Sequence, residues 1–292
     1  MLKNTRNTIF VEEAEVLSQQ AFEEGQFVLR VKAPKCAKSA QPGQFAHVQC
    51  DPQRLMRRPL SIMRTDAKDG WVEFLYKALG EGTELLSKRK IGESVNIMGP
   101  IGRPFELHID RPKALLLGGG VGIPPMICLS ENIKNNQPNI EPLVFMGSEI
   151  PFPFERQPSE LEVKGLSGEA KDGMPLLESW GVPSRLTSLQ GYRGVYQGYI
   201  TDLARQWLNT LSEDEKQQVE IFACGPTPML KAVAALAKEF DLPCQVSLEE
   251  YMACAVGGCA GCVVKVKTNE GEAMKRVCVD GPVFDAATVF GE

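Results

Sequence analysis

Four of the chain's nine cysteines gather near its C-terminal end at a regular spacing. Four residues separate Cys254 from Cys259, two separate Cys259 from Cys262, and fifteen separate Cys262 from Cys278. Cysteines spaced C-x4-C-x2-C, with a fourth further along, are typical of plant-type [2Fe–2S] sites. The six residues between the first three cysteines are Ala, Val or Gly, which lets the main chain wrap closely around inorganic sulfide. The spacing therefore favours a [2Fe–2S] cluster.

Two other interpretations of these cysteines stay open. A structural zinc site usually pairs two C-x2-C knuckles, and only Cys259 and Cys262 form one here. The four thiols can also be unliganded. An odd count of cysteines, and an N-terminus without the apolar run of a signal peptide, argue against a disulfide framework. The five scattered cysteines are expected to be small buried side chains.

A glycine-rich turn directly follows the apolar run 114–117. Main-chain N–H groups in such a turn, between a strand and a helix, can cradle a phosphate. Pro125 stands where the standard fingerprint has Gly or Ala, so a tight connection without a ligand is the alternative. The candidate cofactor-binding residues of this turn are Gly118, Gly119, Gly120, Gly122 and Pro125.

Two further motifs carry polar groups suited to nucleotide cofactors. In the run Arg58-Pro59-Leu60-Ser61, the guanidinium can pair with a pyrophosphate and the Ser61 hydroxyl can face a flavin ring. Gly82 and Thr83 can donate hydrogen bonds to the same diphosphate. Cys224-Gly225-Pro226 follows the apolar run 219–223, and ligands bind at the carboxyl ends of parallel strands. Each motif alone is as readily an ordinary surface motif or, for Cys224, a buried thiol before a turn.

The order of the elements predicts an α+β multidomain chain. Up to about residue 110, short β-rich segments with turn residues between them predict a small antiparallel barrel. From there, apolar strands at 114–117, 143–146 and 219–223 alternate with helices at 201–211 and 227–240, which predicts a parallel sheet. Residues 149–190 contain five prolines and little periodicity, and we expect a long surface excursion there.

The composition excludes several classes of protein. Hydrophobic residues make up 43%, charged residues 24%, and the formal net charge is −5, as in a globular protein without an affinity for nucleic acid. No apolar run is long enough for a membrane span, and we expect a cytoplasmic protein. Only two histidines are present, His47 and His108, so a His-based metal site or triad is not expected and each is predicted to be structural.

Together and in this order, the motifs resemble those of the ferredoxin–NADP reductase superfamily. The C-terminal part narrows the match: residues 247–254, the cysteine spacing and residues 281–284 are similar to the electron-transfer subunit of dihydroorotate dehydrogenase B. The resemblance implies an FAD-binding β-barrel domain at 1–110, an NAD-binding α/β domain at 111–243 and a [2Fe–2S] domain at 244–292. It assigns FAD contacts to Arg58, Pro59, Leu60, Ser61, Leu75, Tyr76, Lys77, Gly82 and Thr83.

The resemblance also implies a function. NAD(H) exchanges electrons with FAD, and the [2Fe–2S] cluster relays them to or from a flavin-containing catalytic subunit that oxidises dihydroorotate in pyrimidine synthesis. Cys254, Cys259, Cys262 and Cys278 are the implied cluster ligands; Ser61 and Cys224 are the candidate catalytic residues, and Cys224, Gly225 and Pro226 would contact the nicotinamide. The implied functional assembly is a hetero-oligomer.

Two alternatives in function remain. A reductase of the same build can serve another acceptor, such as a hydroxylase, another oxidoreductase subunit or a quinone. A redox or metal sensor can retain the fold without catalysis. The excursion at 149–191 is longer than we expect for the family and lies near the adenosine ribose. Glu149 follows the second strand, where an acidic side chain suits free ribose hydroxyls, so we favour NADH over NADPH.

Overall fold

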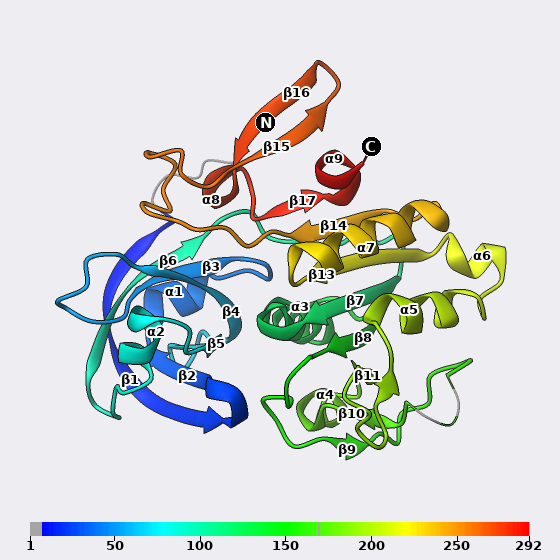
Figure 1. Ribbon diagram of the computed structural model, residues 1–292, viewed down its shortest axis with the longest axis horizontal. Helices are drawn as coiled ribbons and strands as arrows, with labels where there is room; N and C mark the ends of the chain where they lie inside the picture. The colour runs from blue at the N-terminus through cyan, green and yellow to red at the C-terminus, as the bar shows by residue number, and fades with distance from the viewer. Residues whose placement is uncertain (1–7, 167, 169, 292) are drawn as a thin grey trace.

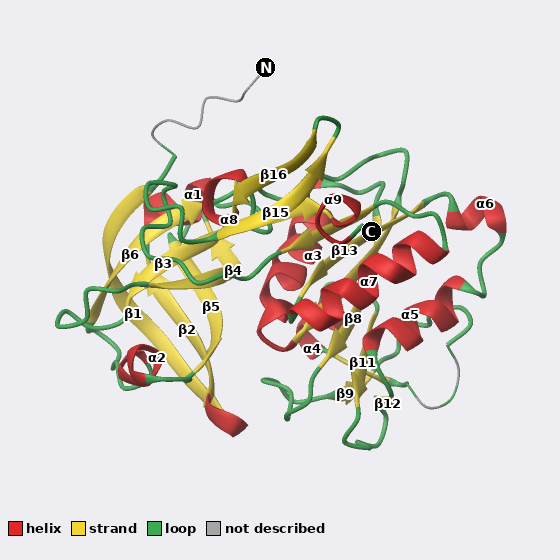
Figure 2. Ribbon diagram, turned by 45° about the horizontal axis from the view of Figure 1, so that its top comes forward, coloured by secondary structure: helices red, strands yellow, loops and turns green. Residues whose placement is uncertain are grey.

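The N-terminal part of the chain is a closed six-stranded antiparallel barrel (Figures 1 and 2). The computed structural model describes residues 8–166, 168 and 170–291, so the predicted absence of a leader at residues 1–7 lies outside it. The strand order around the barrel is β1-β2-β5-β4-β3-β6. The elements are β1 (Phe10–Phe22), η1 (Glu23–Gly25), β2 (Gln26–Lys32), α1 (Pro34–Ser39), β3 (Phe45–Gln49), β4 (Arg58–Asp66), β5 (Trp71–Lys77), α2 (Glu81–Leu86) and β6 (Ser94–Ile101).

Alternating side chains along the strands give the barrel an apolar interior and a second apolar face. In β3, Ala46 and Val48 point into the barrel core. Phe45, the first residue of this strand, points the other way and packs on the second domain. In β2, Leu29 and Val31 fill the interior in the same manner. A period of two places every second side chain on one face of a strand. The barrel therefore has an apolar interior and a second apolar face that covers the adjoining domain.

The second domain is built on a seven-stranded sheet in the order β12-β11-β8-β7-β13-β14-β17. All neighbouring strands are parallel except β17, which pairs antiparallel with β14 at one edge. The strands are β7 (Lys113–Gly119), β8 (Glu141–Gly147), β11 (Ser184–Ser188), β12 (Tyr196–Gln197), β13 (Val219–Cys224), β14 (Cys244–Ser247) and β17 (Val283–Asp285). The first of them has alternate residues on opposite faces and is buried on both, as parallel sheets require.

Helices cover both faces of this sheet (Figure 1). Leu115 and Leu117 pack against α5 (Ile200–Leu208) and α7 (Thr227–Glu239) on one face. Leu116 packs against α3 (Ile123–Asn136) on the other. The predicted helices at 201–211 and 227–240 are present with slightly different ends, and the short η2 (Gly120–Gly122) and α6 (Glu213–Lys216) complete the connections. The predicted α/β domain and the fold class are confirmed.

The excursion at 149–190 is more ordered than the sequence suggested. It contains β9 (Gln157–Pro158), β10 (Asp172–Gly173), α4 (Pro175–Ser179) and the buried sheet strand β11. We missed β11 because four of its five residues are polar. Its buried Arg185 donates to the carbonyls of Ser184 and Leu161, both at 2.7 Å. The excursion thus supplies acceptors that a polar strand needs inside the protein.

The C-terminal segment leaves the sheet after β14 and returns to it as β17. Between them lie a long loop, the hairpin of β15 (Val263–Thr268) and β16 (Gly271–Arg276), and α8 (Val277–Asp280); α9 (Ala286–Phe290) follows. The hairpin projects at the top of Figure 1. The predicted domain boundary at 243/244 comes directly before β14, which pairs with β13 in the sheet of the second domain. The boundary itself stays a prediction. None of the helices in the described residues is long and apolar enough to cross a membrane.

The barrel and the C-terminal segment meet at a close contact between main chains. Arg103 N, two residues after β6, donates to Gly281 O at 2.6 Å. Gly102, with φ +97°, faces this joint; a Cβ there would lie 2.3 Å from Pro282 Cδ. Glycine at this position lets the two segments touch.

We predict that Gly102→Ala destabilises the chain more than Gly92→Ala. Gly92 has a similar φ of +86° but has open space around it. Both alanines carry the strain of the left-handed region, about 1–2 kcal/mol. Only Gly102→Ala adds an overlap, at a further cost of about 1–3 kcal/mol. Denaturant unfolding followed by tryptophan fluorescence measures both, and equal midpoints would contradict the packing explanation.

Candidate functional site

The four predicted cluster thiols converge in two pairs. Cys254 faces Cys259 in the loop after β14, and Cys262 faces Cys278, which comes from α8. The N–H of Cys259 donates to the sulfur of Cys254 at 3.4 Å, and the N–H of Gly261 donates to the sulfur of Cys259 at 3.4 Å. The fold thus brings together Cys254 and Cys259 from one loop, and it brings Cys262 of that loop beside Cys278 of α8.

The electrostatics of the loop favour the thiolate form of Cys254. Burial raises the pKa of the Cys254 thiol, but main-chain N–H groups from the loop outweigh burial and lower this pKa to about 7. Burial and the adjoining Cys262 thiol instead raise the pKa of Cys278 to about 12. Metal binding requires deprotonated thiols and releases the proton, so Cys278 becomes a thiolate only when a metal is bound.

The loop curls because several residues adopt left-handed conformations. Ala255, Gly257 and Ala260 have φ of 56°, 81° and 52°. Arg276 fastens the loop: its Nη1 donates to Gly257 O at 3.1 Å, while its Nε and main-chain N bond to the Asp280 carboxylate at 3.3 and 2.8 Å. Small residues tolerate the turns and one arginine holds them, which gives the cysteines a fixed frame.

The donor set fits a two-iron cluster. Among the described residues, no group of three or more His, Cys, Asp or Glu is placed around one point to hold a single metal ion. A [2Fe–2S] cluster asks for two protein ligands on each of two irons, and the thiols lie as two pairs. Cys262 and Cys278 are buried, Cys254 is half-buried and Cys259 is exposed. Bound there, the cluster would open to the surface on the side of Cys259.

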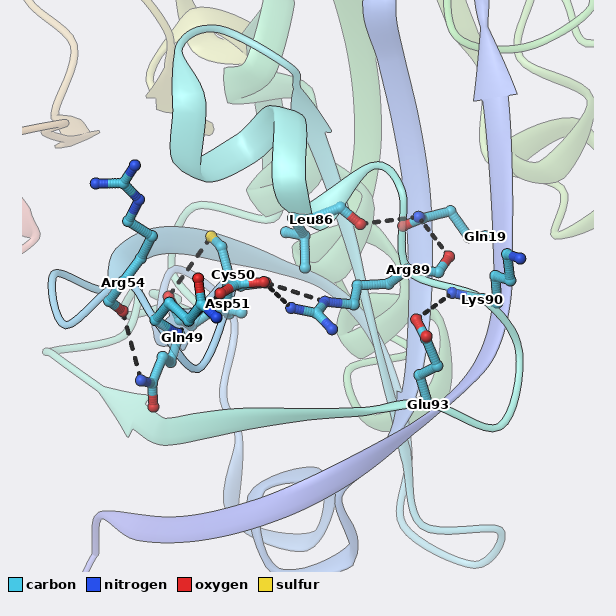
Figure 3. A network of polar contacts seen from close by, with 11 residues as sticks. Gln19, Gln49, Cys50, Asp51, Arg54, Leu86, Arg89, Lys90 and Glu93 are labelled. Atoms are coloured by element: carbon cyan, nitrogen blue, oxygen red, sulfur yellow. Dashed lines mark hydrogen bonds and ion pairs between the residues drawn. The ribbon is translucent and has the colours of Figure 1, made fainter.

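The predicted flavin motif begins at the edge of the barrel, beside α2. A Cβ at Gly82 would lie 3.3 Å from the Arg58 guanidinium, so glycine at this position lets the arginine lie close to the first turn of α2. Figure 3 shows how this region is tied down: Arg89 donates to Cys50 O at 3.2 Å and to Asp51 at 2.5 Å, and Gln19 donates to Leu86 O at 3.0 Å. Arg58 and Gly82 are thus brought together, as a diphosphate site requires.

Three other residues of the predicted flavin set have restricted roles. The Thr83 hydroxyl bonds to both the N–H and the carbonyl of Leu79 at 2.9 Å, so it holds a turn. Tyr76 points into the barrel, where its hydroxyl donates to Gln19 at 3.0 Å. Leu75 faces the second domain. Tyr76 can offer a cofactor only its main chain. Pro59, Ser61 and Lys77 are half-buried and Leu60 is buried, beside the same edge.

The glycine-rich turn packs directly against the turn that follows β13. A Cβ at Gly122 would lie 2.3 Å from Cys224 O, and one at Gly119 would lie 2.4 Å from Met229 Sδ. Gly122 is therefore required by packing against main chain, whereas the clash at Gly119 is with a flexible methionine side chain. Gly120, with φ +54° and open space around it, is the position left for a ligand. The predicted phosphate turn and the Cys224-Gly225-Pro226 turn form one continuous floor.

Two polar residues that sequence reasoning missed complete this floor. Ser247, at the end of β14, lies in register with Cys224 and its hydroxyl faces the thiol. Burial raises the pKa of Cys224 well above its usual value. Glu249 is an exposed residue, and partial desolvation of its carboxyl group raises its pKa. The signal available was topological, since β14 ends beside β13 and its next residues must reach the same edge of the sheet.

The excursion walls a cavity at the carboxyl ends of β8 and β11. Its volume is about 1090 Å³, and Phe152, Phe154 and Tyr192 supply aromatic walls. Arg156 lies over the Tyr192 ring at 5.1 Å and pairs with Asp172 at 3.0 Å. Glu149 is not among the lining residues; its carbonyl accepts from Gln190 at 3.1 Å. The cavity continues the line of strand ends that begins at Cys224.

Comparison with known proteins adds independent information. Residues 249–290 match the iron–sulfur cluster binding domain of dihydroorotate dehydrogenase B, and residues 10–105 match an oxidoreductase FAD-binding domain. A dihydroorotate dehydrogenase B (NAD(+)), electron transfer subunit, from Desulforamulus reducens is 31% identical, covering 96% of this chain and 98% of that protein. The subunit of the same description from Geobacillus thermodenitrificans is 34% identical, covering 94% of this chain and 96% of its own.

Solved structures show the same fold at lower identity. An NADH-dependent reduced ferredoxin-NADP oxidoreductase superposes with a TM-score of 0.76 at 24% identity, covering 95% of this chain and 90% of that one. A ferredoxin reductase of carbazole 1,9a-dioxygenase superposes with a TM-score of 0.59 at 20% identity, covering 80% and 65%.

We predict that Cys259→Ser removes iron and leaves FAD bound, because the thiol pairs lie apart from the Arg58 edge. Iron and flavin analysis of the purified variant, with circular dichroism for the fold, measures the result. Cys128→Ala, which changes a thiol on α3, is the control and should keep both cofactors. Loss of flavin together with iron in Cys259→Ser would contradict two separable sites.

Proposed function

Because this chain belongs to the family of dihydroorotate dehydrogenase B electron transfer subunits, we propose that its domains relay electrons between NAD(H), FAD and a [2Fe–2S] cluster. The chain is an NAD-linked oxidoreductase subunit, and the other end of the relay is a separate catalytic subunit, dihydroorotate dehydrogenase. The observation that carries this proposal is the convergence of three candidate sites on one molecule: the paired thiols, the Arg58–Gly82 edge, and the Cys224 floor.

Each cofactor supplies its own chemistry when bound. Flavin exchanges a hydride, which carries two electrons, and it also exchanges single electrons; the iron–sulfur cluster carries one electron at a time. The chain's residues hold these groups. Arg58, lying on Gly82, would pair with the flavin diphosphate. Ser61 would face the flavin ring from β4. Cys254, Cys259, Cys262 and Cys278 would hold the two irons.

The floor between β7, β13 and β14 is suited to a nicotinamide. Cys224 is fully buried, so its neutral thiol lies beneath this floor and supports it from inside. Ser247 fixes its direction from the next strand. Glu249, the acid whose pKa burial raises, is the group that can hold an amide near the ring. Gly120 and Pro226, which solvent reaches, would border the pyrophosphate, and the predicted Gly118, Gly119, Pro125 and Gly225 lie buried behind them.

The excursion would hold the adenosine end of the same nucleotide. Its cavity lies at the ends of β8 and β11, two strands beyond the floor, and has aromatic walls and the Asp172 carboxylate. A carboxylate at this end suits free ribose hydroxyls. NADH over NADPH remains our proposal, and its support is the NAD(+) in the description of the relatives. Asp172 does not decide it, because this carboxylate pairs with Arg156 and because Lys171 and Arg193 line the same cavity.

Electrons would pass to the partner where the cluster opens to the surface. Cys259 is exposed, and near it in the sequence lie Tyr251 and Val256, whose exposed fractions are 94% and 49%. Exposed aromatic and apolar side chains around a redox centre suit a protein interface. The catalytic subunit would cover this face. All nine cysteines are free thiols, which suits our proposal that the complex works in the cytoplasm.

Reconstitution tests the function directly. The chain is co-expressed with the dihydroorotate dehydrogenase catalytic subunit from the same genome, and NAD⁺ reduction by dihydroorotate is followed at the NADH absorbance. We expect the complex to catalyse it and neither subunit alone to do so, with FAD and iron on this chain. A chain that accepts electrons from NADH but neither binds this partner nor exchanges electrons with it would instead serve another acceptor.

We predict that Glu249→Gln slows reduction of the flavin by NADH by about tenfold. The hydride transfer itself uses no side-chain acid or base, and the carboxyl group would act by positioning the nicotinamide amide. The variant should also be more stable at pH 8. The folded pKa of Glu249 is raised, so its ionised form costs stability above that pKa. This cost disappears below the unfolded value of about 4.3, so the gain shrinks towards that pH.

Stopped-flow kinetics and denaturant unfolding at pH 8 and pH 5 measure the two effects of Glu249→Gln. Glu250→Gln changes the exposed neighbouring carboxylate and is the matched control. The same rate and the same stability in both variants would remove Glu249 from the site.

A further inference from the structure

A buried histidine stands between the flavin strand and the cluster segment and has no assigned role. His47, in β3, is fully buried, and neither ring nitrogen has a hydrogen-bond partner among the described residues. Its neighbours Ala46 and Val48 point into the barrel. By the alternation of a strand, His47 points outward, on the side where Phe45 packs on the second domain.

The surroundings of His47 connect two of the candidate sites. Across β3, it pairs with Pro59 of the flavin motif on one side and with Met98 of β6 on the other. The polar groups that act on its ring belong to the main chains of Arg57 and Met252. Both raise the pKa of His47, as carbonyl acceptors do. Neither forms a hydrogen bond with the ring. Met252 is buried, two residues before Cys254. In Figure 1 the segment after β14 passes above β3 and β6.

Arg57 holds the main chain of His47 in place. Its Nη1 donates to His47 O at 3.2 Å and to Asn96 O at 3.0 Å, so it ties together β3 and β6. Burial and the Arg57 charge lower the pKa of His47 to about 4. The ring is therefore neutral at physiological pH, with one N–H donor and one acceptor nitrogen.

Packing alone does not account for an imidazole here. A leucine would fill a similar space without a polar atom, whereas an unsatisfied buried polar group costs about 1–3 kcal/mol. Buried polar groups in folded proteins almost always find a partner. The two available partners are the main chains of Arg57, next to Arg58, and of Met252, just before Cys254.

We propose that His47 is a positioning residue that sets the spacing between the flavin strand and the cluster segment. Its ring separates the two main chains, and its N–H bonds to one of them when both cofactors are bound. The inference rests on the proposed function, because the spacing matters only if an electron passes between these sites. Electron transfer between two cofactors slows as the distance between them grows, so a change in this spacing would slow the step from flavin to cluster.

The test uses the full chain loaded with FAD and cluster, in three variants. His47→Leu removes both ring nitrogens and keeps the volume; His47→Gln keeps a donor and an acceptor. His108→Gln changes the other histidine, whose ring bonds to Glu220 at the far end of β13, and is the control. NADH is mixed without oxygen, flavin reduction is followed by absorbance, and cluster reduction by freeze-quench electron paramagnetic resonance.

We expect His47→Leu to bind FAD and accept electrons from NADH at the rate of the unchanged chain. Reduction of its cluster should be slower by about tenfold or more, with a shifted or broadened resonance signal. His47→Gln should recover part of the rate and of the signal, and His108→Gln should equal the unchanged chain. If His47→Leu fails to fold, His47→Gln decides, by a slower cluster step with a normal flavin step.

Two results would overturn the role of His47. Normal cluster reduction with a normal signal in His47→Leu would remove it, and so would equal slowing of the flavin step and the cluster step. Failure of the proposed function is a different result, since NADH would then reduce neither flavin nor cluster in the unchanged chain.

Discussion

The cluster segment buries few side chains of its own, and its attachment to the large sheet is the constraint on which the rest of the structure depends. The β15–β16 hairpin contributes few buried side chains, and a two-stranded hairpin alone is marginal in water. The segment is held because β14 and β17 pair with each other at the edge of the sheet, and Pro282 bonds to Leu248. The same attachment fixes the thiols relative to the barrel, through the contact of Gly102 with Pro282.

This constraint also explains where the candidate sites lie. The parallel strands β7, β13 and β14 end at one edge, so the glycine-rich turn, Cys224 and Ser247 share a floor. The barrel covers the second domain with Phe45, and the cluster loop then crosses β3 close to His47. Three short stretches, distant in the sequence, become neighbours because a single sheet and a single barrel face position them.

Local patterns predicted much of this arrangement. The cysteine spacing indicated the cluster loop, and the apolar runs indicated β7, β8 and β13, so the fold class and the family are confirmed. The individual site residues stay predictions. Strand β11 was missed because its burial depends on Leu161, 24 residues earlier, which accepts from Arg185. Glu249 and Ser247 were missed because their partner Cys224 is brought beside them only by strand order. Long-range pairing of this kind leaves no local trace.

The unequal exposure of the four thiols has a consequence for how the chain meets oxygen. Three sides of the cluster position are closed by buried or half-buried sulfur, and the opening lies at Cys259. Dioxygen and stray oxidants would arrive by the same opening through which the partner is reached. A bound partner would therefore shield the cluster from dioxygen as well as exchange electrons with it. Loss of electrons to dioxygen would be greatest when this subunit has no partner bound.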